Sequence, residues 1–161
     1  MKIRTLQTQD HDHVLALNHE SVHFLSPIDP ARLQHLLQES ALHLVVENEG
    51  SVIAFLLAFT KSADYDSVNY TWFEERYPSF LYIDRVVVSQ SLQSKGAGST
   101  LYQAVFSYAK EHGISMVCCE FDIDPPNPIS EQFHAKMGFH EVGKQSLGNA
   151  KKWVSMQALI F

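Results

Sequence analysis

Residues 81–102 read LYIDRVVVSQSLQSKGAGSTLY, and this stretch decides how the rest of the chain is organised. Its first eight residues, 81–88, are almost all apolar or β-branched, which predicts a buried strand. Residues 93–99 then form a short polar turn with two glycines, Gly96 and Gly98, and apolar residues return at helical spacing after it. Together these elements predict an anion site. The first turn of a helix presents unpaired N–H groups, and glycine lets the backbone approach a phosphate closely.

The turn itself indicates which anion to expect. Dinucleotide sites use G-x-G-x-x-G and P-loops use G-x-x-x-x-G-K-[ST], and this stretch has neither pattern. It has Gln93-x-x-Gly96-x-Gly98, after a strand that contains Val86-x-Val88. Because turn glycines are common between strands and helices, the pattern taken alone leaves open a turn without a ligand.

Length and composition predict one globular domain over residues 1–161. A chain of 161 residues has the usual size of one domain, and 45% hydrophobic with 19% charged residues is ordinary for such a domain. The net charge of -6 argues against broad nucleic-acid binding, which usually requires a basic face. The same charge permits a cationic substrate.

The cysteines and the N-terminal segment bear on the compartment. Cys118 and Cys119 are adjacent in a predicted strand, so they point to opposite faces and no disulfide is expected between them. Two cysteines also give no zinc spacing. Residues 1–5 lack the apolar core of a signal peptide, and no apolar run reaches membrane-spanning length. We therefore expect a cytoplasmic protein without a membrane partner.

Turn and cap signals divide the chain into short elements. Asp29-Pro30 and Asn127-Pro128 each read as a cap followed by proline at the first helical position, and glycines 113 and 138 read as helix stops. Expected strands cover 2–7, 41–47, 52–59, 81–88, 114–122, 139–143 and 152–160, with helices beginning near 8, 30, 100 and 128. One strand–helix–strand unit in a hairpin-rich order predicts an α/β (α+β) fold. Its mixed, mostly antiparallel sheet would have about seven strands, with helices on both faces.

The segment between residues 60 and 79 is the least regular part of the sequence. It contains five aromatic residues and no clear periodicity. A long ordered loop of this kind is typical of a lid over a binding site. Aromatic rings equally often plug the edge of a core or form a dimer contact, and both interpretations stay open.

A second motif, residues 127–139, reads NPISEQFHAKMGF. Asn127 opens a short helix, Phe133 follows, and Lys136-x-Gly138-Phe139 closes it. Together with the glycine turn at 93–98, this motif resembles the signature of the GNAT acetyltransferases, and the neighbouring residues resemble a bacterial branch of that superfamily. The resemblance covers the element order of the whole chain, and residues 81–143 in detail.

The resemblance implies a site for acetyl-CoA as co-substrate. In this superfamily two parallel strands splay apart and the pantetheine arm lies between them; here these are residues 81–88 and 115–122. The pyrophosphate would bind N–H groups of the glycine turn. The N–H of Val86 would polarise the thioester carbonyl. The residues expected to contact acetyl-CoA are Val86, Val87, Val88, Gln93, Ser94, Lys95, Gly96, Ala97, Gly98, Ser99, Asn127, Ser130 and His134.

The resemblance also implies catalytic roles. His134 stands where most relatives carry a tyrosine that protonates the leaving thiolate. We expect His134 to act as this acid, or else to pack beside the thiol while water donates the proton. The expected base is Asp84, because two-residue alternation puts it on one strand face with Tyr82, Val86 and Val88. Glu120, on the adjacent strand, is the second candidate.

Asp84 and one pair of histidines each have a second interpretation. Asp84 could be the partner of an arginine, either Arg85 of a neighbouring chain or Arg4. His19 and His23 lie four residues apart on an expected helix, a spacing that could bind a metal. No carboxylate–histidine set accompanies them at a firm spacing, so we expect no metal site.

The sequence thus predicts an N-acetyltransferase that transfers an acetyl group to a primary amine of a small molecule or a peptide end. Direct attack would need no covalent enzyme intermediate. One alternative is a non-catalytic acyl-CoA sensor or interaction module on the same fold. The other is a plain nucleotide-binding domain, which ranks last because the chain has neither the dinucleotide nor the P-loop glycine pattern. The sequence leaves a homodimer open and does not identify the acceptor.

Overall fold

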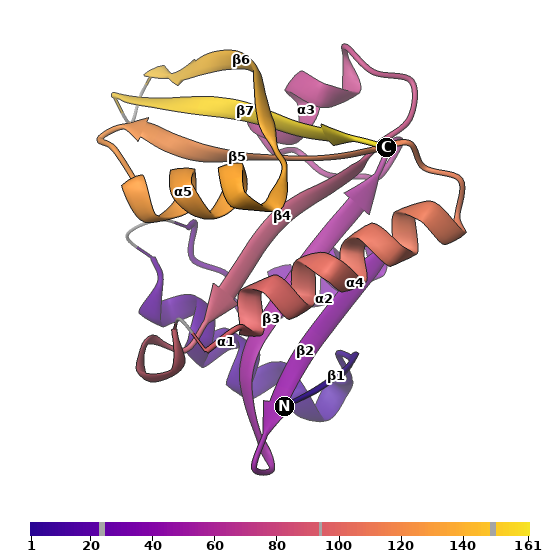
Figure 1. Ribbon diagram of the computed structural model, residues 1–161. Helices are drawn as coiled ribbons and strands as arrows, with labels where there is room; N and C mark the ends of the chain where they lie inside the picture. Colours follow the sequence, from indigo (N-terminus) through magenta and orange to yellow (C-terminus); the bar gives the residue numbers. More distant parts are fainter. Residues whose placement is uncertain (23–24, 94, 149–150) are drawn as a thin grey trace.

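The computed structural model describes residues 1–22, 25–93, 95–148 and 151–161 (Figure 1). Seven strands form one sheet in the order β1-β2-β3-β4-β5-β7-β6. The strands are β1 (Lys2–Thr5), β2 (Leu42–Asn48), β3 (Ser51–Thr60), β4 (Leu81–Val88), β5 (Met116–Asp124), β6 (His140–Leu147) and β7 (Lys152–Ile160). The α-helices are α1 (His11–Glu20), α2 (Pro30–Glu39), α3 (Val68–Glu74), α4 (Ala97–Glu111) and α5 (Pro128–Met137).

The sheet is mixed, as predicted. β4 and β5 are parallel, and every other neighbouring pair is antiparallel. A parallel pair needs a crossover, and α4 supplies it. Buried residues of α1, α2 and α3 pack on one face of the sheet, and those of α4 pack on the other beside residues of α5. The predicted seven-stranded α+β architecture with helices on both faces is therefore confirmed.

The caps expected from the sequence are present. The Asp29 side chain accepts the backbone N–H of Arg32 at 2.7 Å at the start of α2. The Asn127 side chain accepts the N–H of Ser130 at 3.3 Å at the start of α5. Gly138 ends that helix with φ +101°, a left-handed conformation that glycine adopts without strain.

Three expected boundaries are wrong. Residues 68–74 form α3, with the Ser67 side chain accepting the N–H of Tyr70, inside the segment expected to be irregular. The helix is short and its buried faces are aromatic, so it shows little apolar periodicity. α4 begins at Ala97 rather than Thr100, because the small residues after Gly96 are already helical. β6 continues to Leu147 as an edge strand with alternating exposure, which its polar sequence hides.

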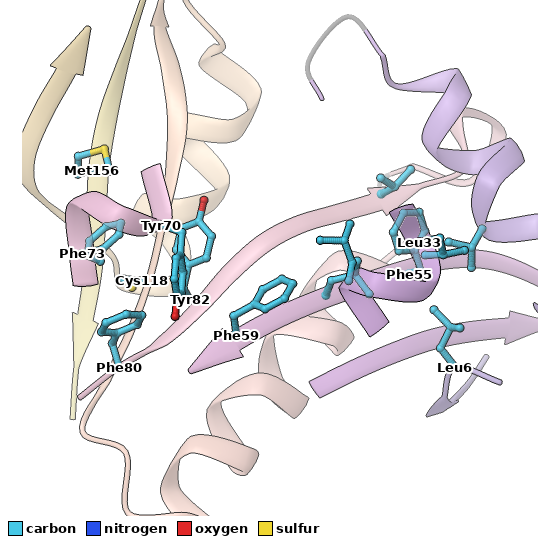
Figure 2. Close-up of a cluster of buried hydrophobic side chains, with 14 of the residues drawn as sticks. Leu6, Leu33, Phe55, Phe59, Tyr70, Phe73, Phe80, Tyr82, Cys118 and Met156 are labelled. Carbon is cyan, nitrogen blue, oxygen red and sulfur yellow. The ribbon is translucent and has the colours of Figure 1, made fainter. Parts of the chain in front are cut away.

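The core on the α1–α3 face is rich in aromatic side chains (Figure 2). Tyr70 of α3 packs edge-on against Tyr82 of β4, Phe80 and Phe59, with ring centroids 5.6 to 6.2 Å apart. All four rings are almost fully buried. Such pairs stabilise beyond their area burial, so the aromatic segment before β4 is a structural part of the core.

A β-bulge interrupts the centre of β4. The register against β3 shifts, so that Leu57 pairs with Arg85 while Ala58 pairs with Ile83. Asp84 is the extra residue between them and has no partner on β3. A bulge of this kind changes the phase of side-chain alternation along a strand.

The bulge corrects one prediction about side-chain direction. Asp84 and Arg85 both bond to residues on the α1–α3 side, where Tyr82 is also buried. Val86 and Val88 pack with the core on the opposite, α4 side. The expectation that Asp84 shares a face with these two valines is therefore wrong, because simple alternation does not hold across the extra residue.

Candidate active site

A cleft lies between β4 and β5. The two strands pair only at Leu81 with Val117 and at Tyr82 with Cys118, and then diverge (Figure 1). A cleft of about 940 Å³ opens beyond these pairs. Because the divergent stretches no longer pair with each other, their backbone groups are available to an extended ligand.

One side of the cleft carries most of the expected co-substrate contacts. We call it the α5 side. The candidates that line the cleft are Val86, Val87, Val88, Gln93, Gly96, Ala97, Gly98, Ser99, Asn127, Ser130 and His134. Lys95 is exposed and does not line it, and Ser94 lies outside the described residues.

The glycine turn leads into α4 as expected for an anion site. Gly96 is the N-cap with φ +90°, where a side chain would be strained. A Cβ on Gly98 would lie 3.7 Å from the Phe133 ring, which also lines the cleft. The N–H groups that follow Gly96 open the 15-residue helix α4 toward this end of the cleft, and its dipole favours a negative group there.

The other side of the cleft is built on the α1–α3 face, and we call it the α3 side. It holds charged and polar residues together with a few apolar ones. These are Arg32, Tyr65, Asp66, Ser67, Asn69, Asp84, Arg85, Glu120, Asp122, Leu147, Lys152 and Val154.

Asp84 lies in a buried ion pair on the α3 side. Its Oδ2 accepts Nε of Arg85 at 2.6 Å, and both side chains are only 5% exposed. The Tyr65 hydroxyl donates to its other carboxylate oxygen. The arginine partner is Arg85 of the same chain; Arg4 pairs instead with Asp10, at 2.7 Å. Both oxygens of Asp84 are thus already engaged by donors of the protein, which leaves neither of them free for a substrate amine.

Glu120 differs from Asp84 in having only neutral partners. The Tyr82 hydroxyl lies 2.8 and 2.9 Å from its two oxygens, and Nδ2 of Asn69 donates to Oε1 at 3.0 Å. Burial raises the pKa of Glu120 to about 8, opposed by the Tyr82 hydrogen bond and assisted by the nearby charge of Asp84. A cleft carboxylate with a pKa near neutrality suits a general base.

His134 is buried against α4. Its Nδ1 lies 2.7 Å from the carbonyl oxygen of Ser130, and its Nε2 lies 2.8 Å from the Tyr102 hydroxyl. A carbonyl only accepts, so Nδ1 carries the proton. Burial lowers the pKa of His134, so the ring is neutral at pH 7 and its Nε2 accepts from Tyr102. The only N–H of the ring is therefore already used, which favours the packing role over the acid role.

This arrangement predicts how two variants of His134 differ. His134→Gln keeps polar atoms beside Tyr102 and should lower kcat at pH 7.5 by less than about fivefold. His134→Phe leaves the buried Tyr102 hydroxyl without its acceptor and should cost about 1–3 kcal/mol of unfolding free energy. Steady-state kinetics and urea unfolding measure the two effects. A loss of about 100-fold in kcat for His134→Gln with unchanged stability would restore the acid role.

Four residues of the site were not identified from the sequence. The sequence predicts Arg85 only as an ion-pair partner from another chain, and Tyr65 only as one ring of the aromatic segment. Asn69 of α3 and Tyr102 of α4 reach the site through helical packing. Of these four residues, only Tyr102 has a signal in the sequence, because it stands four residues after Gly98 on the inner face of α4.

The structure gives little support to a cysteine nucleophile or to a metal site at His19 and the described residues near it. Cys118 and Cys119 face opposite cores, as expected, and burial raises the pKa of both thiols, which disfavours a nucleophilic thiolate. His19 is exposed at the end of α1, and His23 lies outside the described residues. Across residues 1–22, 25–93, 95–148 and 151–161, no three metal-ligating side chains cluster. In the same residues no helix is long and apolar enough to cross a membrane.

Comparison with known proteins gives one family. Residues 6–139 match the sequence model of the acetyltransferase (GNAT) family. No curated protein is similar enough in sequence to count as a relative. The fold is similar to that of Ard1 from Thermoplasma volcanium, with TM-score 0.78, 20% identity, and 99% of this chain and 96% of that chain covered. It is also similar to ribosomal-protein-alanine N-acetyltransferase from Brucella melitensis, with TM-score 0.75, 20% identity and full coverage of both chains. At these identities the structural likeness speaks for the fold alone.

Proposed function

The chain belongs to the acetyltransferase (GNAT) family and is an acetyl-CoA-dependent N-acetyltransferase, and we propose that it transfers the acetyl group directly to a primary amine with Glu120 as the base. The observation that carries this proposal is the hydrogen bonding of the cleft carboxylates. Glu120 has neutral partners and a pKa near 8, whereas Asp84 is held by Arg85.

The α5 side of the cleft supports the binding of acetyl-CoA. The diverging strands leave backbone groups of residues 83–88 for an extended pantetheine arm. The glycine turn and the start of α4 suit the pyrophosphate, because N–H groups and the helix dipole both favour negative charge. We assign Asn127, Ser130 and His134 to the far wall of the arm, since all three line the cleft from α5 and its cap.

The proposed reaction begins with an ammonium substrate on the α3 side. The ionised Glu120 carboxylate takes one proton from it, and the free amine attacks the thioester carbonyl carbon. The new carbon–nitrogen bond forms, the carbon–sulfur bond breaks, and CoA leaves as a thiolate. As the amide forms, the attacking nitrogen gives its second proton to a water molecule, and that water passes a proton to the thiolate, so the released CoA ends as the free thiol. The backbone N–H of Val86 stabilises the oxyanion that forms on the way.

The rival is a non-catalytic acyl-CoA sensor on the same fold. Free CoA release separates the two, with acetyl-CoA and a panel of primary amines as substrates. We expect a new thiol to appear with at least one amine, and acetyl-CoA to bind in calorimetry. Binding without thiol release on any amine would favour the sensor. No binding at millimolar acetyl-CoA would contradict both.

A further inference from the structure

The charges on the α3 side of the cleft are distributed unevenly. Each of its cations already faces a carboxylate: Arg32 lies 2.7 Å from Asp66, and Lys152 lies 3.2 Å from Asp122. Arg85 is buried against Asp84, and its remaining guanidinium nitrogens bond to Asn18 and Ser26 of the α1 region. Among the described residues that line this side, none is an unpaired cation.

Glu120 is the opposite case, a carboxylate without a cationic partner. Its hydrogen bonds come from Tyr82 and Asn69, which are neutral. Asp84 and Asp122 lie close enough for their charges to act on it. The place beside Glu120 is therefore one that favours a cation and disfavours an anion.

We propose that the acceptor is an amine whose amine-bearing carbon carries no anionic group, such as a peptide N-terminus or an alkylamine, and that free α-amino acids are rejected. This rests on the proposed function, because it places the substrate nitrogen at Glu120. In an α-amino acid the carboxylate is attached to the amine-bearing carbon. That carboxylate would lie among Glu120, Asp84 and Asp122. The nearest cations, Arg85 and Lys152, are already paired with Asp84 and Asp122.

Three matched substrates test this inference: leucine, leucinamide and 3-methylbutylamine, which is leucine without its carboxylate. Their side chain suits the apolar part of this side, Leu147 and Val154. We expect kcat/KM for both the amide and the alkylamine to exceed that for leucine by at least about 30-fold, because like charges brought together oppose binding. The alkylamine is no less basic than leucine, so amine basicity cannot produce its advantage. Equal or better use of leucine would overturn the inference.

Freeing a cation beside the site gives a second test. Asp122→Asn leaves Lys152 without its partner, and the ratio of kcat/KM for leucine to that for leucinamide should rise about tenfold. Asp12→Asn, an exposed position on α1 away from the cleft, removes the same charge and should leave the ratio unchanged. An unchanged ratio in Asp122→Asn would refute the charge explanation.

A binding measurement separates this inference from the proposed function. Calorimetry with the CoA-saturated protein compares leucine and 3-methylbutylamine without any turnover. We expect the alkylamine to bind at least about tenfold more tightly even if no amine is acetylated. Absence of turnover alone would count against the proposed reaction, whereas tighter binding of leucine would count against the inference.

Discussion

Replacing Glu120 with glutamine is expected to lower kcat/KM for an amine acceptor about a thousandfold near pH 8, because the amide cannot take the substrate proton. In the wild-type protein kcat/KM should rise with pH toward a plateau, with an apparent pKa near the value of about 8 that burial gives Glu120. The rise should be absent in Glu120→Gln. Kinetics between pH 6 and pH 9.5, with amines of different basicity, separate this rise from the titration of the substrate.

The same substitution should stabilise the protein at high pH. The pKa of Glu120 is raised on folding from 4.5 to about 8, so the folded protein holds a proton that the unfolded chain releases. The stability from this proton is complete below the unfolded pKa and is lost as the pH rises through 8. Glutamine has no such loss, so the advantage of Glu120→Gln should grow by about 3–4 kcal/mol between pH 5 and pH 8. Urea unfolding at the two pH values measures it, with Glu49→Gln, an exposed turn position, as the control. A parallel change in both variants would contradict the assignment.

Replacing Arg85 with leucine is expected to destabilise the protein by about 3–5 kcal/mol, because the Asp84 carboxylate is left buried without its cation. The guanidinium also bonds to Asn18 at 3.0 Å and to Ser26 Oγ at 3.2 Å, so the link from β4 to the α1 region is lost with it. Unfolding with urea gives the size of the loss. In the double variant Asp84→Leu with Arg85→Leu a large part of the stability should return, since no charge is then stranded. Equal stability of the single and double variants would show that the pair is not coupled.

Asp84→Asn decides between the two carboxylates as the base. The charge of Asp84 helps to raise the pKa of Glu120, so removing it should move the pH–rate profile to lower pH while keeping its shape. If Asp84 itself took the proton, the rise of the profile would disappear. The Arg85 partner would be left without its carboxylate, so stability is measured alongside.

The sequence predicted the strand–turn–helix at 81–111 and the capped helix at 128–137 well, because glycine, proline and cap residues act locally. It could not predict α3. That helix is short, and contacts with Phe80 and Tyr82 rather than periodicity stabilise it. Nor could it predict the bulge at Asp84, which depends on the register against β3 and shifts the side-chain alternation of β4 by one residue.

The candidate site shows the same division between local and long-range information. Contiguous motifs predicted residues 86–88, the glycine turn and Asn127, and all but Lys95 of the expected contact residues that the structure describes line the cleft. The order of preference between Asp84 and Glu120 depends on Arg85, Tyr65 and Asn69, which meet only in the folded chain. A pKa is a property of such an environment, so no pattern in the sequence carries it.

The edge of a sheet carries unpaired N–H and C=O groups that can pair with a strand of another chain, and most sheets have two such edges. Because β4 and β5 share only two residue pairs, this sheet has four: the outer edges of β1 and β6, and two inner ones that face each other. The outer edges are protected in the usual ways, by the shortness of β1 at four residues and by the charged side chains along β6. The inner edges belong to two largely apolar strands, β4 and β5, and such edges promote aggregation when they are exposed. Both inner edges face into the protein's own cleft. The divergence of β4 and β5 therefore makes room for one extended ligand and also keeps two unpaired strand edges out of reach of other chains.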